Sequence, residues 1–201
     1  MKDAVSLWSL SAAQLRDHLS SVAPTPGGGS ACIVAATLGA ASVHKGIIVS
    51  LKRSSADPAR HQALLRLSSQ VLALIVTLSE LADADSTAFQ HYLETSALPS
   101  ATEDEKTARK KARESSLLHA TRVPLAAAVE MSGAVALAKA AAPLVDAHVR
   151  SEVLSGSVLL RASIKSVLIG VDANLPGILD VALRESLRRQ REKLEDSSEL
   201  C

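Results

Sequence analysis

A glycine run follows two prolines and precedes a long apolar segment. It reads Pro24-Thr25-Pro26-Gly27-Gly28-Gly29-Ser30. Glycine lets a ligand approach the backbone closely, and amide groups at the start of a helix can bind an anion or a carbonyl oxygen. A flexible connector between helices has the same composition, and the run matches neither the Rossmann nor the P-loop pattern. The local pattern alone therefore favours a connector.

Two carboxylates further along the chain are candidates for proton transfer. Asp83 and Asp85 are two residues apart, so they point to different sides of a helix, and Asp85 lies one turn before Phe89. A carboxylate that faces a cavity can act as a general acid or base. Solvated charge on a helix surface is the commoner interpretation of such a residue.

Lys52 and Arg53 end the apolar segment that follows the glycine run. They can complement the negative end of a helix dipole, or they can attract an anionic substrate tail. Cys32 is closer to the glycines, but no histidine has a spacing that guarantees pairing with it. A small buried hydrophobic role is therefore the expectation for Cys32.

The remaining polar residues predict neither a metal site nor a nucleic-acid surface. The six histidines form no His-x-x-x-His or Glu-x-x-His pair, so no metal ligand set is expected. Lys and Arg number 22 against 21 acidic residues, which leaves no basic footprint for DNA or RNA. The two cysteines, Cys32 and Cys201, make no disulfide framework, as is typical of a reducing cytoplasm.

Composition favours helices as the elements that position these residues. Ala, Leu and Val supply most of the 47% hydrophobic content, and Trp8, Phe89 and Tyr92 are the chain's aromatic residues. Large β-forming residues are therefore scarce. The sequence predicts an all-α, single-domain bundle over residues 1–201, with about six to seven mostly antiparallel helices.

Capping signals mark where the first helices begin. Ser11-Ala12-Ala13-Gln14 has the form of a capping box and predicts a helix to about Ser21. The glycine run starts an apolar helix that lasts until about residue 54. Asp57 before Pro58 predicts the start of a third helix that continues towards Pro99. Thr102-Glu103-Asp104-Glu105 is a second capping box and predicts a fourth.

The second half of the chain predicts shorter helices. Pro124 is expected to begin or kink a fifth helix, which ends near Ala142. Residues 147–171 form a sixth. The segment Asn174-Leu175-Pro176-Gly177 predicts a turn, and a charged terminal helix follows over residues 178–195.

Neither a membrane span nor a secretory signal is expected. His44, Lys45 and Lys52 interrupt the apolar stretch before it reaches the roughly 20 residues that a span requires. Met1-Lys2-Asp3-Ala4 leads into no long apolar region with a cleavage site. A cytoplasmic location is the expectation.

Taken together, several segments resemble the formiminotetrahydrofolate cyclodeaminase and methenyltetrahydrofolate cyclohydrolase family. The resemblance rests on an ordered series of motifs that covers most of the chain. They are Pro24-Thr25-Pro26-Gly27-Gly28-Gly29-Ser30, Leu38-Gly39-Ala40-Ala41, Asp85-Ser86-Thr87-Ala88-Phe89, Leu98-Pro99, Thr102-Glu103-Asp104-Glu105-Lys106-Thr107-Ala108-Arg109 and Val123-Pro124-Leu125.

The resemblance implies a homodimeric helical enzyme, a hydrolase or lyase that acts on a tetrahydrofolate derivative without a metal or other cofactor. It implies Asp85, Ser151 and Glu152 as catalytic candidates. It also implies that the substrate is bound by Pro26, Gly27, Gly28, Gly29, Ser30, Lys52, Arg53 and His148. In this context the glycine run becomes substrate-facing backbone.

Two segments depart from the family pattern. A lysine-rich segment is expected where this chain has Leu51-Lys52-Arg53-Ser54-Ser55-Ala56, and a Gly-Asn motif is expected near residues 145–152. Two alternatives therefore stay open. One is a diverged enzyme that makes or breaks a C–N bond in a non-folate substrate, and the other is a non-catalytic helical dimerisation partner.

Overall fold

The computed structural model describes residues 5–199 and contains helices but no strand in that range. Met1-Lys2-Asp3-Ala4, on which the expectation of no secretory signal partly rests, and Cys201 lie outside it. The α-helices are α1 (Ala12–Leu19), α2 (Gly28–Leu51), α3 (Pro58–Ser96), α4 (Glu103–Ala141), α5 (Arg150–Asn174) and α6 (Val181–Glu199). Short 3-10 turns cover Leu7–Ser9, Ala147–Val149 and Leu175–Gly177. The predicted all-α class is confirmed.

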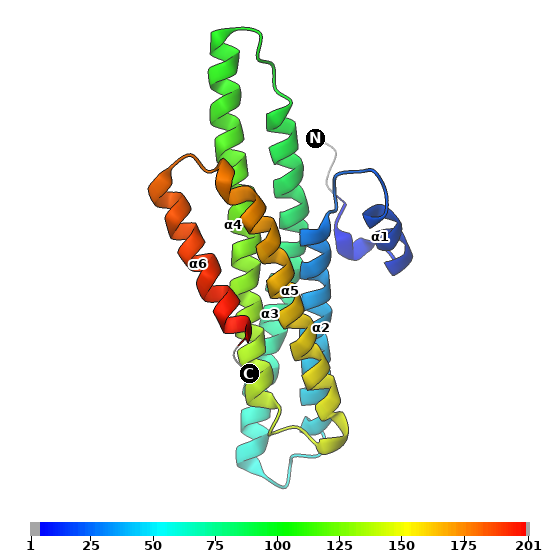
Figure 1. Cartoon of the computed structure of the whole chain (residues 1–201). Helices are drawn as coiled ribbons and strands as arrows, with labels where there is room; N and C mark the ends of the chain where they lie inside the picture. Colours follow the sequence, from blue (N-terminus) through cyan, green and yellow to red (C-terminus); the bar gives the residue numbers. More distant parts are fainter. Residues whose placement is uncertain (1–4, 200–201) are drawn as a thin grey trace.

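Four long helices, α2 to α5, form the bundle, and α6 lies against its side (Figure 1). The core between them is made of aliphatic side chains that are less than 2% exposed. Examples are Ile33 and Ile47 on α2, Leu78 on α3, Met131 on α4 and Leu160 on α5. The end of α3 and the start of α4 form a hairpin that projects beyond the other helices.

Small residues let α2 and α5 cross closely. A Cβ on Gly39 would lie 2.9 Å from the carbonyl oxygen of Gly156, and a Cβ on Gly156 would overlap the Gly39 carbonyl oxygen. Gly46 has a similar contact, because its Cβ would lie 2.6 Å from a methyl group of Val153. The crossing therefore fixes the position of α5 against the helix that follows the glycine run.

The predicted helix starts are confirmed. Ser11 and Gln14 form a capping box at α1, Thr102 and Glu105 form one at α4, and Asp57 caps α3 ahead of Pro58. These side chains satisfy amide groups that have no partner inside the helix.

The prediction that Pro124 begins a separate helix is wrong, because α4 continues through it. Proline at 124 lacks the N–H that would bond the carbonyl oxygen of Ala120 one turn earlier. The side-chain amide of Asn174, at the end of α5, donates to that oxygen at 3.3 Å. The neighbouring helix therefore replaces the missing hydrogen bond.

Four segments are long and apolar enough, by length and composition alone, to cross a membrane: Gly28–Leu51, Pro58–Ser96, Glu103–Ala141 and Ala147–Gly177. In α2 this holds although Lys45 lies within the helix, because an apolar window tolerates one or two charges. The charges near residues 44–52 are therefore insufficient to rule out a span, and the absence of one stays a prediction.

Candidate functional site

The glycine run forms the start of α2. Gly27 is the N-cap residue with an extended backbone and no capping side chain, and its carbonyl oxygen accepts the first helical hydrogen bond, from Ala31. The amide groups of the first turn have no partner within the helix and point outwards along its positive end. Gly28, Gly29 and Ser30 therefore present backbone donors, which we call the glycine cradle together with Gly27.

Asp85 faces this cradle from the C-terminal half of α3. The hydroxyl of Ser30 donates to Oδ2 of Asp85 at 2.7 Å. Asp83, two residues earlier, points elsewhere and accepts hydrogen bonds from Ser6 and the backbone of Leu7. The predicted opposite orientation of the two aspartates is confirmed, and Asp85 is the one that faces the cradle.

The absence of a side chain at Gly29 is what admits the Asp85 carboxylate. A Cβ at this position would lie 2.8 Å from Oδ2 and 3.3 Å from Oδ1 of Asp85. No such contact exists at Gly28, where a Cβ would meet nothing within 4 Å. Of these two glycines, Gly29 is the one required by packing inside the protein.

Burial raises the pKa of Asp85 above that of an ordinary aspartate, and the hydrogen bond from Ser30 opposes part of that rise. A carboxylate with a raised pKa is a stronger base once it is ionised. This is the property that a proton-transfer group near neutral pH requires.

A pocket of about 240 Å³ lies in front of these groups. The cradle and Asp85 form its polar side, and Phe89, Pro124 and Val167 contribute apolar surface. Asn174 also lines the pocket. Its side-chain amide is the group that donates to the carbonyl oxygen of Ala120. The sequence placed Asn174 only in a turn, because its role depends on contact with Ala120, which lies 54 residues earlier in the sequence.

A second group of predicted residues, Glu152, Arg53 and His148, lies elsewhere on the molecule. Lys45 bonds Glu152 at 2.7 Å, and Arg53 lies 3.4 Å from the imidazole of His148. Lys45 is about 22 Å further along α2 than Ser30, because a helix rises about 1.5 Å per residue. The predicted residues therefore fall into two clusters near opposite ends of α2.

The other predicted residues are placed as follows. Ser151 is exposed beside Glu152, Lys52 is exposed at the end of α2, and Pro26 is buried and does not line the pocket. Cys32 packs against the core with its sulfur 3.0 Å from the Ser166 hydroxyl, but it is partly buried and not fully buried as expected. Within residues 5–199, no three His, Cys, Asp or Glu side chains gather as a metal ligand set.

Sequence comparison places this geometry among known proteins. A family model described as formiminotransferase-cyclodeaminase matches residues 11–193. Methenyltetrahydrofolate cyclohydrolase of Methylorubrum extorquens is 30% identical over 180 residues, which are 89% of this chain and 85% of that protein. Formimidoyltransferase-cyclodeaminase of Gallus gallus is 31% identical over 165 residues, which are 77% of this chain but 28% of the chicken protein.

The fold has a counterpart among solved structures. The crystal structure of formiminotetrahydrofolate cyclodeaminase from Thermotoga maritima matches with a TM-score of 0.82 and 20% sequence identity. The match covers 94% of this chain and 90% of that one, so the two share the whole arrangement of helices. From the family model over residues 11–193 and the 30% identical relative, the chain belongs to the formiminotransferase-cyclodeaminase family.

Proposed function

We propose that this chain is a one-carbon folate enzyme in which Asp85 transfers protons at the carbon that bridges N5 and N10. The observation that carries the proposal is the Asp85 carboxylate, held by Ser30 against the glycine cradle at the wall of a pocket. The names of the two relatives supply the substrate class.

In the cyclohydrolase direction, water attacks the methenyl carbon, which carries the positive charge of the N5,N10-amidinium. Asp85 accepts a proton from that water as the C–O bond forms. The C–N5 bond then breaks, and N5 takes up a proton as the hydroxyl becomes the formyl oxygen. One proton is released overall. The cradle amide groups stabilise negative charge on the oxygen during these steps.

In the cyclodeaminase direction, N10 attacks the formimino carbon, and Asp85 accepts the N10 proton. The same carboxylic acid then protonates the departing nitrogen, which leaves as ammonia. Both reactions place one carboxylate beside one carbon, so a single residue in the position of Asp85 serves either.

The experiment measures both reactions with the purified protein. Loss of the amidinium absorbance of methenyltetrahydrofolate reports hydrolysis, and ammonia release from formiminotetrahydrofolate reports deamination. We expect the protein to accelerate at least one of these two reactions above its uncatalysed rate. The reaction that is accelerated identifies the activity as cyclohydrolase or cyclodeaminase. No acceleration of either reaction would refute the proposal.

The diverged enzyme remains the second candidate. Its support is the segment Leu51-Lys52-Arg53-Ser54, which lies at the far end of α2 from the pocket. The same pocket would then act on another C–N bond. The convergence of Ser30, Asp85 and Asn174 on one pocket weighs against the third alternative, a partner protein without a reaction.

We also propose that the enzyme is a homodimer whose copies pack antiparallel through the exposed side of α2 and α5. Leu38, Ile48 and Leu159 are 40–56% exposed there, and the Lys45–Glu152 ion pair lies across the same two helices. An antiparallel partner would bring its own Lys45–Glu152 ion pair towards this protomer's glycine cradle.

Sedimentation of the wild type and of Ile48→Glu tests the dimer. The expected result is a dimeric wild type and a monomeric variant with reduced turnover. A wild type that is fully active as a monomer would contradict this assembly.

A further inference from the structure

The Asp85 pocket lies between two helices that stand diagonally across the bundle. α3 and α5 each pack mainly against α2 and α4, and both contribute to the pocket wall. α3 supplies Asp85 and Phe89, and α5 supplies Val167, Gly170, Ala173 and Asn174. The α5 residues recur at the spacing of one helix face. A molecule in the pocket therefore meets α3 on one side and this face of α5 on the other.

Gly170 is the position on this face of α5 that carries no side chain. Among the residues that the structure describes, a Cβ at 170 would meet nothing within 4 Å beyond its own turn of helix. Its backbone belongs to the interior of α5 and has no positive φ. Neither packing nor backbone conformation therefore requires glycine here. Alanine would favour the helix, because glycine weakens a helix interior.

The glycines at the crossing of α2 and α5 differ from Gly170. A Cβ on Gly39, Gly46 or Gly156 would lie less than 3.0 Å from an atom of the facing helix. Close helix packing explains these three glycines. At Gly170 the space that a side chain would take belongs to the pocket. Only a molecule bound in the pocket can fill that space.

We propose that Gly170 is a specificity-determining residue, because the missing side chain leaves room for an uncharged, flat ring system of the substrate to pack on the backbone of α5. This inference rests on the proposed function. The α5 wall carries no charged side chain, since its members are Val167, Gly170, Ala173 and Asn174. The proposed base Asp85 belongs to α3. A side chain at 170 would therefore narrow the pocket of about 240 Å³ without displacing the base.

The test measures KM and kcat of Gly170→Ala and Gly170→Leu with the folate substrate that the wild type turns over. We expect KM to rise about tenfold in Gly170→Ala, since one methyl group that a pocket cannot accommodate changes specificity by about 10-fold or more. KM should rise further in Gly170→Leu, while kcat stays similar in both. Gly170→Ala should also melt at a higher temperature than the wild type, because alanine favours the helix.

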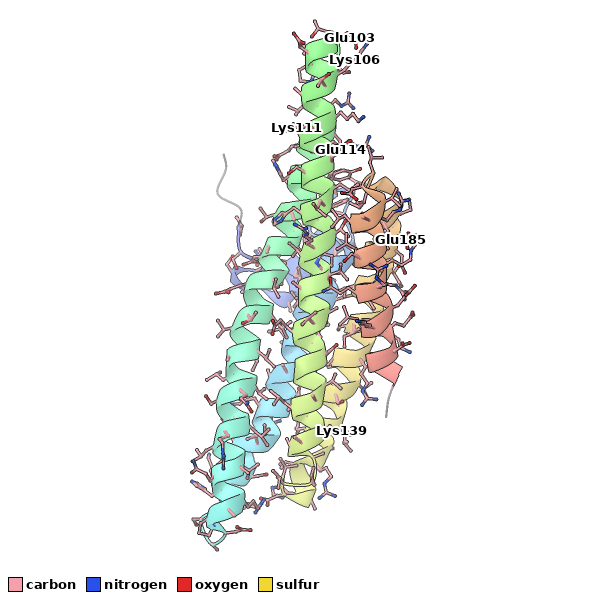
Figure 2. The ribbon with its side chains drawn as sticks, turned by 90° about the vertical axis from the view of Figure 1, so that its left-hand side faces the viewer. Glu103, Lys106, Lys111, Glu114, Lys139 and Glu185 are labelled. Carbon is pink, nitrogen blue, oxygen red and sulfur yellow. The ribbon has the colours of Figure 1, made fainter. Side chains whose placement is uncertain are left out.

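Gly133 provides the matched control. It is an exposed glycine inside α4, six residues before Lys139, which Figure 2 labels on the same helix. A Cβ at 133 would make one ordinary contact, at 3.9 Å from Cδ1 of Leu74. The position does not line the Asp85 pocket and lies about 14 Å along α4 from Pro124, which does. Gly133→Ala should therefore raise the melting temperature and leave KM unchanged.

A wild-type KM in both Gly170 variants would overturn the inference, while turnover upholds the proposed function. If the wild type turns over neither folate substrate, the proposed function fails, and calorimetric titration with 5-formyltetrahydrofolate decides the role of Gly170 separately. Binding that weakens in Gly170→Leu but not in Gly133→Leu supports the inference. Equal binding by these two variants, or no binding to the wild type, overturns it.

Discussion

Gly29 and Asp85 lie so close that a single methyl group on Gly29 would meet the carboxylate at 2.8 Å. This contact joins the start of α2 to the C-terminal half of α3, through two residues that are 56 positions apart in the sequence. The position of the proposed base therefore depends on a residue that has no side chain.

Gly29→Ala is expected to lower kcat/KM by at least about tenfold, because the carboxylate or the first turn of α2 must move. The comparison is Gly28→Ala, whose added Cβ meets no protein atom within 4 Å. Any loss of kcat/KM in Gly28→Ala would indicate that the added methyl group contacts the substrate, and not that Asp85 has moved. Equal activity of Gly29→Ala and wild type would show that the close approach is not required.

The pH profile should report the environment of Asp85. Burial raises its pKa, and the Ser30 hydrogen bond lowers it. Since the ionised form is the base, kcat/KM should rise with pH through a pKa above the ordinary aspartate value of about 4. Ser30→Ala removes the hydrogen bond that favours the ionised form, so its acidic limb should lie at higher pH. A limb displaced to lower pH would contradict this arrangement.

Asp85 should also reduce stability at neutral pH. Its folded-state pKa is raised, so the folded protein holds the proton more tightly than the unfolded chain. The contribution of Asp85 to stability is therefore most favourable below its pKa in the unfolded chain, and it is lost as pH rises through its pKa in the folded protein. Asp85→Asn should melt at a higher temperature than the wild type at pH 7, and this difference should shrink in acid. Identical melting temperatures at pH 7 would be inconsistent with a raised pKa.

Asn174 and Pro124 should be energetically coupled. Asn174→Ala leaves the Ala120 carbonyl oxygen without a partner and is expected to cost about 1–3 kcal/mol of unfolding free energy. In a Pro124→Ala background the helix can supply its own N–H to that oxygen, so the same substitution should cost less. Chemical denaturation of the four proteins in this cycle measures the coupling. Purely additive costs would indicate that Asn174 does not replace the missing hydrogen bond.

Local signals predicted the helix starts correctly because capping is decided within four residues. Each capping box bonds the free backbone amide groups at its own helix start without help from the rest of the fold. The two boxes are Ser11 with Gln14 and Thr102 with Glu105. Pro124 was misjudged as a helix start because the group that compensates for it, Asn174, is 50 residues away. No local pattern can contain such a contact.

The same reasoning separates the predicted site residues. The glycine cradle and Asp85 were named in sequence, and the fold brings them together. Lys52 and Arg53 directly follow the helix that begins at the cradle, and the 24 residues of α2 separate its two ends by about 36 Å.

The most direct measurement of the central claim is hydrolysis of methenyltetrahydrofolate by the wild type and by Asp85→Asn, under the same conditions. The variant keeps the size of the side chain and an oxygen that can accept from Ser30, but it cannot take a proton. We predict that the wild type accelerates the loss of the amidinium absorbance, and that Asp85→Asn, folded as judged by its melting transition, is slower by about 10²-fold or more. A folded Asp85→Asn protein with wild-type turnover would contradict the account.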